Sequence, residues 1–285
     1  VNESRVLIGL VSVRTLLLHE EDDIISDIME SSIVSVNTLD DQETVSQMLS
    51  KYDFIAMPVV DQEHRLVGIV TIDDAMDVME AEATEDMEKM AAIMPSDKPY
   101  LKTGVLETFK ARTPWLMILM LSATFTGLIM THFENALMAC AVLTAFIPML
   151  SGTGGNPGPQ ASTAVIRALS LGEIDFRDTF HVIWKEARVA LICGICLAAA
   201  NFVKMMLIDR MLMQNPAVTV LVALVVCLTL ICTVLCAKVV GCSLPILAEK
   251  LGLDPAVMAS PFISTVVDAL SLLVYFRIAT AILGI

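Results

Sequence analysis

Five apolar stretches in the second half of this chain dictate most of what it can fold into. A helix needs about 20 apolar residues to cross the hydrocarbon core of a bilayer. Each stretch approaches or exceeds that length, and short polar joints separate them. The expected spans are 114–131, 134–150, 186–208, 217–240 and 256–282. We therefore predict an all-α membrane domain over residues 114–285.

Charge divides the chain at the same place. Residues 1–113 carry 23 of the 32 acidic residues but only 9 of the 18 basic ones, whereas residues 114–285 carry nine of each sign. The net charge of −14 therefore resides in the first part. Nucleic acid is excluded as a partner because binding phosphates needs a basic surface. Cations are the expected binding partners of this acidic part.

Basic residues near the span ends predict the orientation. The joint at 167–188 carries four of them, and we place Lys238 and Lys250 in a second joint, 238–250, on the same side. The joint near 204–210 has only two. Because basic loops stay inside, the amino-terminal part is predicted to be cytoplasmic and the carboxyl terminus external, in a cell membrane.

The second span runs into a segment rich in glycine and proline. "IPMLSGTGGNPGPQASTAVIRALS" begins at Ile147 and returns to a helical pattern only after several helix breakers. Irregular backbone cannot face lipid, but it is tolerated where it lines water or protein, and broken helices mark ion sites in transporters. We interpret the segment as pore-lining; the alternative is an ordinary cytoplasmic turn.

A carboxylate interrupts the last span. "SPFISTVVDALSLLVYF" is almost wholly apolar, yet Asp268 lies near its middle. A charge at bilayer depth is costly, so such residues usually face a cavity and serve a function. The alternative is a structural aspartate bonded to a neighbouring helix.

The soluble part reads as a small α/β domain. Strands are predicted at 56–60 and 66–71, followed by a helix, and the stretch 40–53 has helical spacing. "RVLIGLVSVRTLLL", from Arg5, looks like the second strand and helix of an earlier copy. We expect residues 1–22 to end a truncated first repeat and 23–76 to form the second.

An acidic helix follows, and we assign residues 77–113 to it and its linker. Eight carboxylates lie between Asp73 and Glu88. The opposite face carries apolar side chains through which the helix is expected to pack: Met76, Met79, Ala83, Met87, Met90 and Met94. Clustered carboxylates repel one another unless cations lie between them. The alternative is a solvated face, which is the usual meaning of a charge run.

These motifs together resemble a known family. The strand–strand–helix ending in Gly68-x-x-Thr71-x-x-Asp74 looks like a CBS domain. The whole order is similar to the MgtE family of magnesium transporters, through "YDFIAMPVVDQEHRLVGIVTIDDAMDVMEAEATED", "PYLKTGVLETFKARTPWL", "SGTGGNPGPQAS" and "DPAVMASPFISTVVD". The chain departs from the family pattern after Asn156, where Pro157-Gly158-Pro159 stands for Thr-Gly-Asn, and at Ser260, where Asn is usual. The resemblance also implies a further acidic helical domain ahead of residue 1.

The resemblance implies a homodimeric, channel-like Mg²⁺ transporter with a pore between protomers. Mg²⁺ prefers oxygen ligands and keeps much of its water, so one carboxylate from each of two chains suits a hydrated ion. Ser264 lies one helical turn before Asp268, with Ser260 and Ser271 near the same stripe. The candidate pore residues are Asp268, Ser264, Ser260, Gly154 and Asn156.

The resemblance further implies that the acidic helix is a plug, held against the CBS body by regulatory Mg²⁺. The candidate residues for those sites are Asp74, Asp77, Glu82, Glu85, Asp86, Asp41, Glu43 and Asp53. CBS domains also commonly bind adenine nucleotides such as ATP, which would place phosphate at Thr71, ribose at Asp74 and the base at Phe54. An empty CBS cleft is the alternative.

Other functions remain as competing hypotheses. One alternative is a transporter of another divalent cation, such as Co²⁺ or Mn²⁺. The other is a membrane-anchored nucleotide sensor that transports nothing. Enzymatic activity is not expected, because the four histidines are scattered and no nucleophile–base pattern or phosphate loop occurs.

Overall fold

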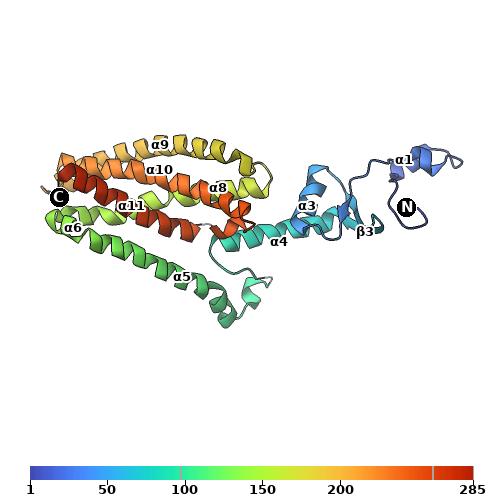
Figure 1. The fold of residues 1–285 in the computed structure, drawn as a ribbon, viewed down its shortest axis with the longest axis horizontal. Helices are drawn as coiled ribbons and strands as arrows, with labels where there is room; N and C mark the ends of the chain where they lie inside the picture. The colour runs from blue at the N-terminus through green and yellow to red at the C-terminus, as the bar shows by residue number, and fades with distance from the viewer. Residues whose placement is uncertain (97, 259, 285) are drawn as a thin grey trace. The chain divides into compact units, whose positions relative to one another are not determined.

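The computed structural model describes residues 1–96, 98–258 and 260–284, with the side chain of Ser260 left out. The chain divides into two compact units, Val1–Thr84 and Glu85–Ile285. The division falls inside one continuous helix, α4 (Ile72–Met90), seen in Figure 1. The boundary that the sequence suggested after residue 76 also lies within this helix.

A three-stranded sheet organises the first unit. Strand β1 (Val36–Asn37) pairs in parallel with β2 (Ala56–Val60), which pairs antiparallel with β3 (Leu66–Thr71). Both longer strands match their predicted ranges. Helix α3 (Gln42–Lys51) confirms the predicted helix, and its Asp41 cap accepts backbone hydrogen bonds. The core of the unit brings together Val36, Leu49, Met57 and Ala75.

The start of the chain forms less structure than we predicted. Helices α1 (Val13–Leu18) and α2 (Ile25–Ile28) are short. The strand expected before α1 is wrong, because that stretch makes only isolated bridges, from Val6 to Arg65 and from Leu10 to Glu30. A strand needs hydrogen-bonded neighbours along its length, and this stretch has two isolated bridges instead.

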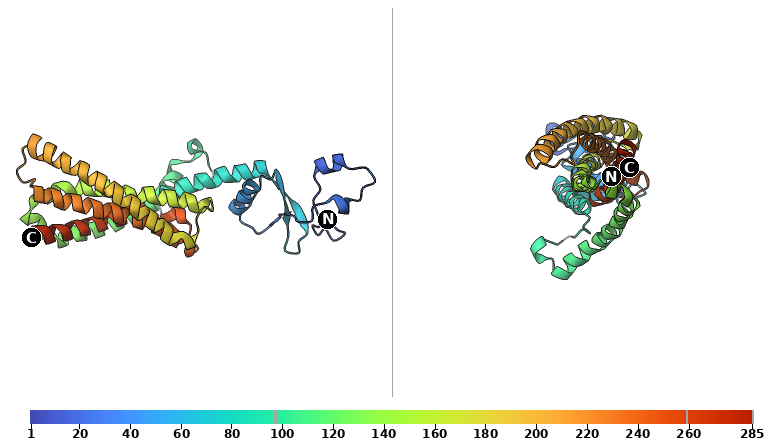
Figure 2. Two further views of the ribbon diagram at one scale, coloured as in Figure 1. Left: turned by 90° about the horizontal axis from the view of Figure 1, so that it is seen from above. Right: turned by 90° about the vertical axis from the view of Figure 1, so that its left-hand side faces the viewer.

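The second unit is helical. Its longer elements are α5 (Val105–His132), α7 (Ile147–Gly155), α8 (Pro157–Ser170), α9 (Thr179–Lys204), α10 (Val220–Lys250) and α11 (Ser260–Leu283). Its short elements are η1 (Tyr100–Lys102), α6 (Glu134–Ala139), η2 (Ala141–Phe146), η3 (Phe176–Asp178), the π-helical η4 (Met205–Leu212) and η5 (Pro255–Met258). Helix α10 is central and packs against α8, α9 and α11 (Figures 1 and 2).

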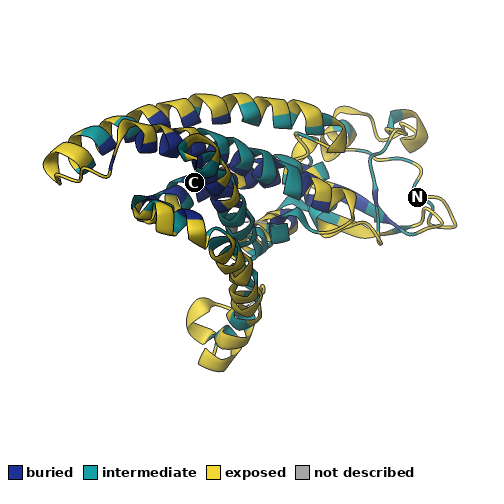
Figure 3. Ribbon diagram, turned by 60° about the vertical axis from the view of Figure 1, so that its left-hand side comes forward, coloured by how far each residue is buried: buried dark blue, intermediate teal, exposed yellow. Residues whose placement is uncertain are grey.

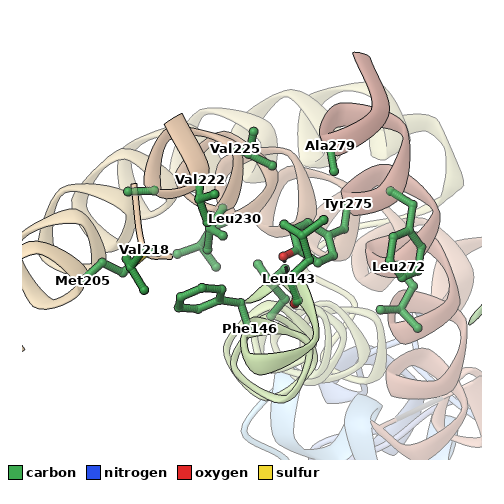
Figure 4. Packing of buried hydrophobic residues seen from close by; sticks show 14 of the residues in the cluster. Leu143, Phe146, Met205, Val218, Val222, Val225, Leu230, Leu272, Tyr275 and Ala279 are labelled. Atoms are coloured by element: carbon green, nitrogen blue, oxygen red, sulfur yellow. Dashed lines mark hydrogen bonds between the residues drawn. The ribbon is translucent and has the colours of Figure 1, made fainter. Parts of the chain in front are cut away.

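Burial follows that arrangement. Buried residues concentrate on α10 and on the faces turned toward it, whereas α5 carries none among its described residues (Figure 3). The largest cluster joins side chains from four segments, including Leu143, Phe146, Leu230 and Tyr275 (Figure 4). The Tyr275 hydroxyl donates to the Leu143 carbonyl at 3.0 Å, so this buried polar group is satisfied.

The second expected span is not one helix. Residues 134–150 divide into α6, η2 and the start of α7, and Cys140, with φ −139° and ψ 77°, breaks the first helix. Among the described residues, four helices are long and apolar enough to cross a membrane. They lie within Val105–His132, Phe176–Leu212, Val220–Lys250 and Pro255–Leu283.

The joint predicted at 238–250 is also wrong, because α10 continues through it and contains Pro245. Lys238 therefore lies inside a long helix, where its ammonium group pairs with Glu186 of α9 at 2.8 Å. These side chains are only 9% and 14% exposed. Each charge neutralises the other, which is the condition for burying either one.

Breaking this pair should destabilise the bundle. Lys238→Met leaves the Glu186 carboxylate buried without a partner, which typically costs about 3–5 kcal/mol. We expect a clear drop in the melting temperature of the detergent-solubilised protein, measured by size-exclusion chromatography after heating. The double variant Lys238→Met/Glu186→Gln should recover much of the loss.

The exposed pair of Lys98 and Glu107, 2.7 Å apart, provides the control. Lys98→Met should change the melting temperature little, because exposed pairs contribute about 1 kcal/mol or less. Equal losses at Lys238 and Lys98 would contradict the role assigned to the buried pair.

Candidate functional site

Asp268 meets the broken segment directly. The Ser151 hydroxyl of α7 donates to Oδ1 of Asp268 on α11 at 2.5 Å. A Cβ placed on Gly155 would lie 3.5 Å from the same oxygen. The half-buried carboxylate therefore faces the glycine-rich end of α7, and Ser151 is a contact that the sequence did not single out.

The segment around Asn156 is helical, contrary to the irregular backbone that we expected. Helix α7 continues through Gly155, and α8 begins at Pro157 after one turn residue with φ −62° and ψ −38°. The helix still carries a defect, because Pro157 and Pro159 have no N–H group. The carbonyl groups four residues earlier, on Thr153 and Gly155, therefore lose their usual helical donors.

Small residues let the neighbouring helices approach this defect. A methyl group on Gly158 would come within 2.8 Å of Ile263 on α11, and one on Gly154 would overlap Thr233 on α10. A methyl group on Gly241 would overlap the Gly158 carbonyl. The glycines thus set the distances among α7, α8, α10 and α11.

The polar side chains of this region differ in their hydrogen-bond partners and in their burial. Ser271 is buried and donates to the Val267 carbonyl at 2.7 Å. The Thr233 hydroxyl is buried without a hydrogen-bond partner among the described residues. Ser264 is half-buried one turn before Asp268, and Asn156 is exposed. Ser260 begins α11, but its side chain lies outside the described part of the chain.

The regulatory candidates in the first unit make local contacts. Thr71 donates to Asp74 at 2.7 Å, and Gln42 of α3 donates to Glu82 of α4 at 2.7 Å. Asp53 adopts a left-handed φ of 54° at the end of the α3 turn. The other candidates here are Asp41, which caps α3, Glu43, which bonds with Gln47, and Asp77, which is exposed. Within the described residues, no group of three or more His, Cys, Asp or Glu side chains is arranged to hold a metal ion.

The last turns of α4 dock onto the helical unit. Lys89 lies 2.5 Å from both Glu85 and Asp254, which precedes η5 and α11. Ser170 at the end of α8 donates to Asp86 at 3.3 Å. Burial lowers the pKa of Lys89, but the hydrogen bonds to Asp254 and Glu85 outweigh it, so this pKa lies above its usual value. The sequence did not identify Asp254 as a partner.

The methionine face of α4 differs from expectation. We predicted that the helix packs through its methionines, but four of them are exposed: Met76, Met79, Met87 and Met94. Ala83 is exposed too. Met90 packs against Ile166 and Ala256.

The candidate nucleotide residues lie in two different hollows. Asp74 lines one of about 360 Å³ with polar residues that include Asn37, Thr38 and Asp40. Phe54 lines another of about 130 Å³ and stacks on Tyr52 with ring centroids 5.5 Å apart. The structure therefore brings Thr71 and Asp74 together, whereas Phe54 lines a different hollow from Asp74.

The fold and the site define a membrane protein in which a CBS-type domain precedes a bundle of apolar helices. Comparison with known families agrees. Residues 25–81 match the CBS domain, and residues 147–278 match MgtE, described as a divalent cation transporter.

Curated relatives match almost the whole chain. The magnesium transporter MgtE of Thermus thermophilus is 39% identical over 99% of this chain, and that of Bacillus subtilis is 37% identical over 99%. The MgtE of Enterococcus faecalis is 32% identical over 98%. The chain belongs to the MgtE family, and it spans 61%, 60% and 59% of these three relatives, respectively.

Two solved structures share sequence with part of the chain. One is the cytosolic domain of the Mg²⁺ channel MgtE in complex with ATP, 45% identical, covering 27% of this chain and 32% of that one with a TM-score of 0.27. The other is the soluble part of a magnesium transporter, 43% identical, covering 29% of this chain and 32% of that one with a TM-score of 0.29.

The contact between Gly241 and Gly158 generates a prediction. Gly241→Ala places a methyl group against the Gly158 backbone, so α8 and α10 must separate, at about 1–3 kcal/mol for such overpacking. We expect a lower melting temperature of the purified protein. Gly127→Ala is the matched control, because a Cβ there meets nothing within 4 Å. An unchanged melting temperature for Gly241→Ala would show that the close approach is not needed.

Proposed function

We propose that this chain is the pore-forming part, with part of the cytosolic regulatory region, of a homodimeric Mg²⁺ transporter. The relatives named above are magnesium transporters, which supports the ion. The observation that carries the proposal is the position of Asp268 against the defect between α7 and α8. A carboxylate and carbonyl groups without their usual donors supply the oxygen atoms that a hard cation prefers.

One carboxylate per chain suits a pore on a two-fold axis. Mg²⁺ gives up water reluctantly, and one or two carboxylates are enough to hold it while it remains hydrated. Two copies of Asp268 facing each other supply that number. Ser264 and Ser271 then lie near the coordinated water, and α11 and the α6–α8 segment line the passage. In this arrangement the segment from α6 to α8 completes a fifth crossing.

Regulation is proposed to act through α4. The bond between Lys89 and Asp254 ties the end of the acidic helix to the residues that lead into α11, which carries Asp268. Cytosolic Mg²⁺ bound among the α4 and CBS carboxylates relieves their repulsion and favours the compact, closed state. The amino-terminal unit accordingly lies in the cytosol and the carboxyl terminus outside.

A nucleotide such as ATP is proposed as a second ligand. The hollow beside Asp74 supports it, since hydroxyl and carboxylate groups line it and suit ribose and phosphate contacts. Asp74 is then shared by the nucleotide and the metal proposals. The two ligands would compete for this carboxylate.

Replacing the pore carboxylate tests the central step. Asp268→Asn keeps the shape but removes the charge, so Mg²⁺ uptake by proteoliposomes should fall to the background of empty vesicles. Glu173→Gln, an exposed acid in the turn after α8, is the control and should transport normally. Normal uptake by a folded Asp268→Asn protein would contradict the proposal. Uptake of Co²⁺ or Mn²⁺ in preference to Mg²⁺ would reassign the ion.

Removing the Lys89 contact tests the regulatory step. Lys89→Gln loses both ion pairs, so the closed state should require more Mg²⁺, with a rise of about twofold to fivefold in the half-inhibiting concentration. The measurement is Mg²⁺ flux as a function of Mg²⁺ on the side of the amino-terminal unit. Lys98→Gln breaks an exposed pair with Glu107 and should leave inhibition unchanged. Identical inhibition curves for Lys89→Gln and the parent would count against the contact.

A further inference from the structure

The first turns of α9 expose a row of aromatic side chains. Phe176, Phe180 and Trp184 follow one another at intervals of four residues and are 42%, 74% and 58% exposed. The first lies in η3, which leads into α9. Residues four apart share one face of a helix. Exposed aromatic rings are enriched where a membrane protein meets the boundary between headgroups and hydrocarbon.

A basic or imidazole side chain follows each aromatic ring. These residues are Arg177, His181 and Lys185, all exposed. Arg188, one turn on, lies with its guanidinium carbon 5.9 Å from the centre of the Trp184 ring. Lys250 at the end of α10 adds a fifth group, 4.0 Å from the centre of the Phe176 ring.

Three of the nearby acids are engaged elsewhere, and a fourth, Glu249, lines a surface hollow together with Arg177 and Lys250. Asp175 and Asp178 form a capping box around η3, and the Asp175 side chain accepts from the Arg177 backbone at 2.7 Å. Glu186, the single acid in the sequence of α9, pairs with Lys238. Within the described residues, no ion pair involves Arg177, Lys185 or Arg188. Their positive charge is therefore available on the exposed surface of η3 and α9.

The same face then becomes purely aliphatic. Leu191, Ile192 and Ile195 are 49%, 70% and 53% exposed. Along one helix, a band of aromatic and basic residues thus gives way to an aliphatic surface. This order matches the passage from headgroups into hydrocarbon.

We propose that the face formed by Phe176, Arg177, Phe180, His181, Trp184, Lys185 and Arg188 binds the headgroup of an anionic phospholipid. Charge complementarity carries the assignment: the cationic groups meet the phosphodiester and the rings lie beside the upper acyl chains. Arg is well suited to phosphate because its guanidinium donates two parallel hydrogen bonds. The proposal rests on placing α9 in a membrane, and it is independent of the transported ion.

Quenching of Trp184 fluorescence by brominated lipids tests this site. The full chain carrying Trp115→Phe retains Trp184 as its only tryptophan. The protein is placed in nanodiscs of phosphatidylcholine that contain a small, equal fraction of either brominated phosphatidylglycerol or brominated phosphatidylcholine. We expect the anionic lipid to quench at least about threefold more strongly, since several basic residues near an anionic headgroup each attract it.

Charge removal separates a specific site from general contact. Arg177→Gln/Lys185→Gln/Arg188→Gln should reduce the ratio of the two quenching values to about one. The matched control is Lys204→Gln/Arg210→Gln at the far end of the same apolar segment, which should keep the parent ratio. Lys185→Gln alone, with an intermediate ratio, serves if the triple variant does not elute as folded protein.

Four results would overturn the proposal. The first is equal quenching by the two lipids in the parent protein. The second is an unchanged ratio in the charge-removed variants. The third is loss of the preference on adding inorganic phosphate at low concentration, which would assign the face to a soluble anion. The fourth is weak quenching by both lipids, which would mean that a second copy of the chain covers the face.

Discussion

The hydrogen bond between Ser151 and Asp268 is the interaction on which the helical unit is organised. It joins the last long helix to a segment that cannot complete its own backbone bonding, because two prolines follow Asn156. A lone carboxylate in an apolar bundle needs polar partners, and a helix defect needs polar neighbours. Each meets the requirement of the other, and together they create an oxygen-rich point in an apolar bundle.

Much of the fold could be predicted because it depends on local pattern. Strands β2 and β3 match their predicted ranges, since apolar runs bounded by "DQEHR" leave little choice. The expectation of one continuous helix over 134–150 was wrong, because hydropathy does not detect the break at Cys140. The joint at 238–250 was wrong because Lys238 and Lys250 were interpreted as loop residues. In the fold, Glu186 neutralises Lys238, and helix α10 accommodates Pro245.

The residues of the candidate site also differ in whether the sequence alone could identify them. Asp268 stands out in the sequence because its charge is anomalous among apolar residues, and the glycines of α7 stand out by composition. Ser151 and Asp254 do not, because their importance comes from partners more than one hundred residues away in the chain. The methionines of α4 follow a clear helical period, yet most of them are exposed. A helical period shows which residues share a face, but it does not show whether another element covers that face. The contact of Lys89 with Asp254 links that helix to the residues just before α11.

The account therefore depends on a metal ion meeting Asp268 between two chains. The most direct measurement is a structure of the dimer with Mn²⁺ in place of Mg²⁺, with the metal located by its anomalous scattering. The account predicts a metal peak on the two-fold axis, either about 2.1 Å from a carboxylate oxygen of Asp268 or about 4–5 Å away through water. It is contradicted if the metal peaks lie elsewhere and both Asp268 side chains are closed off from any aqueous passage.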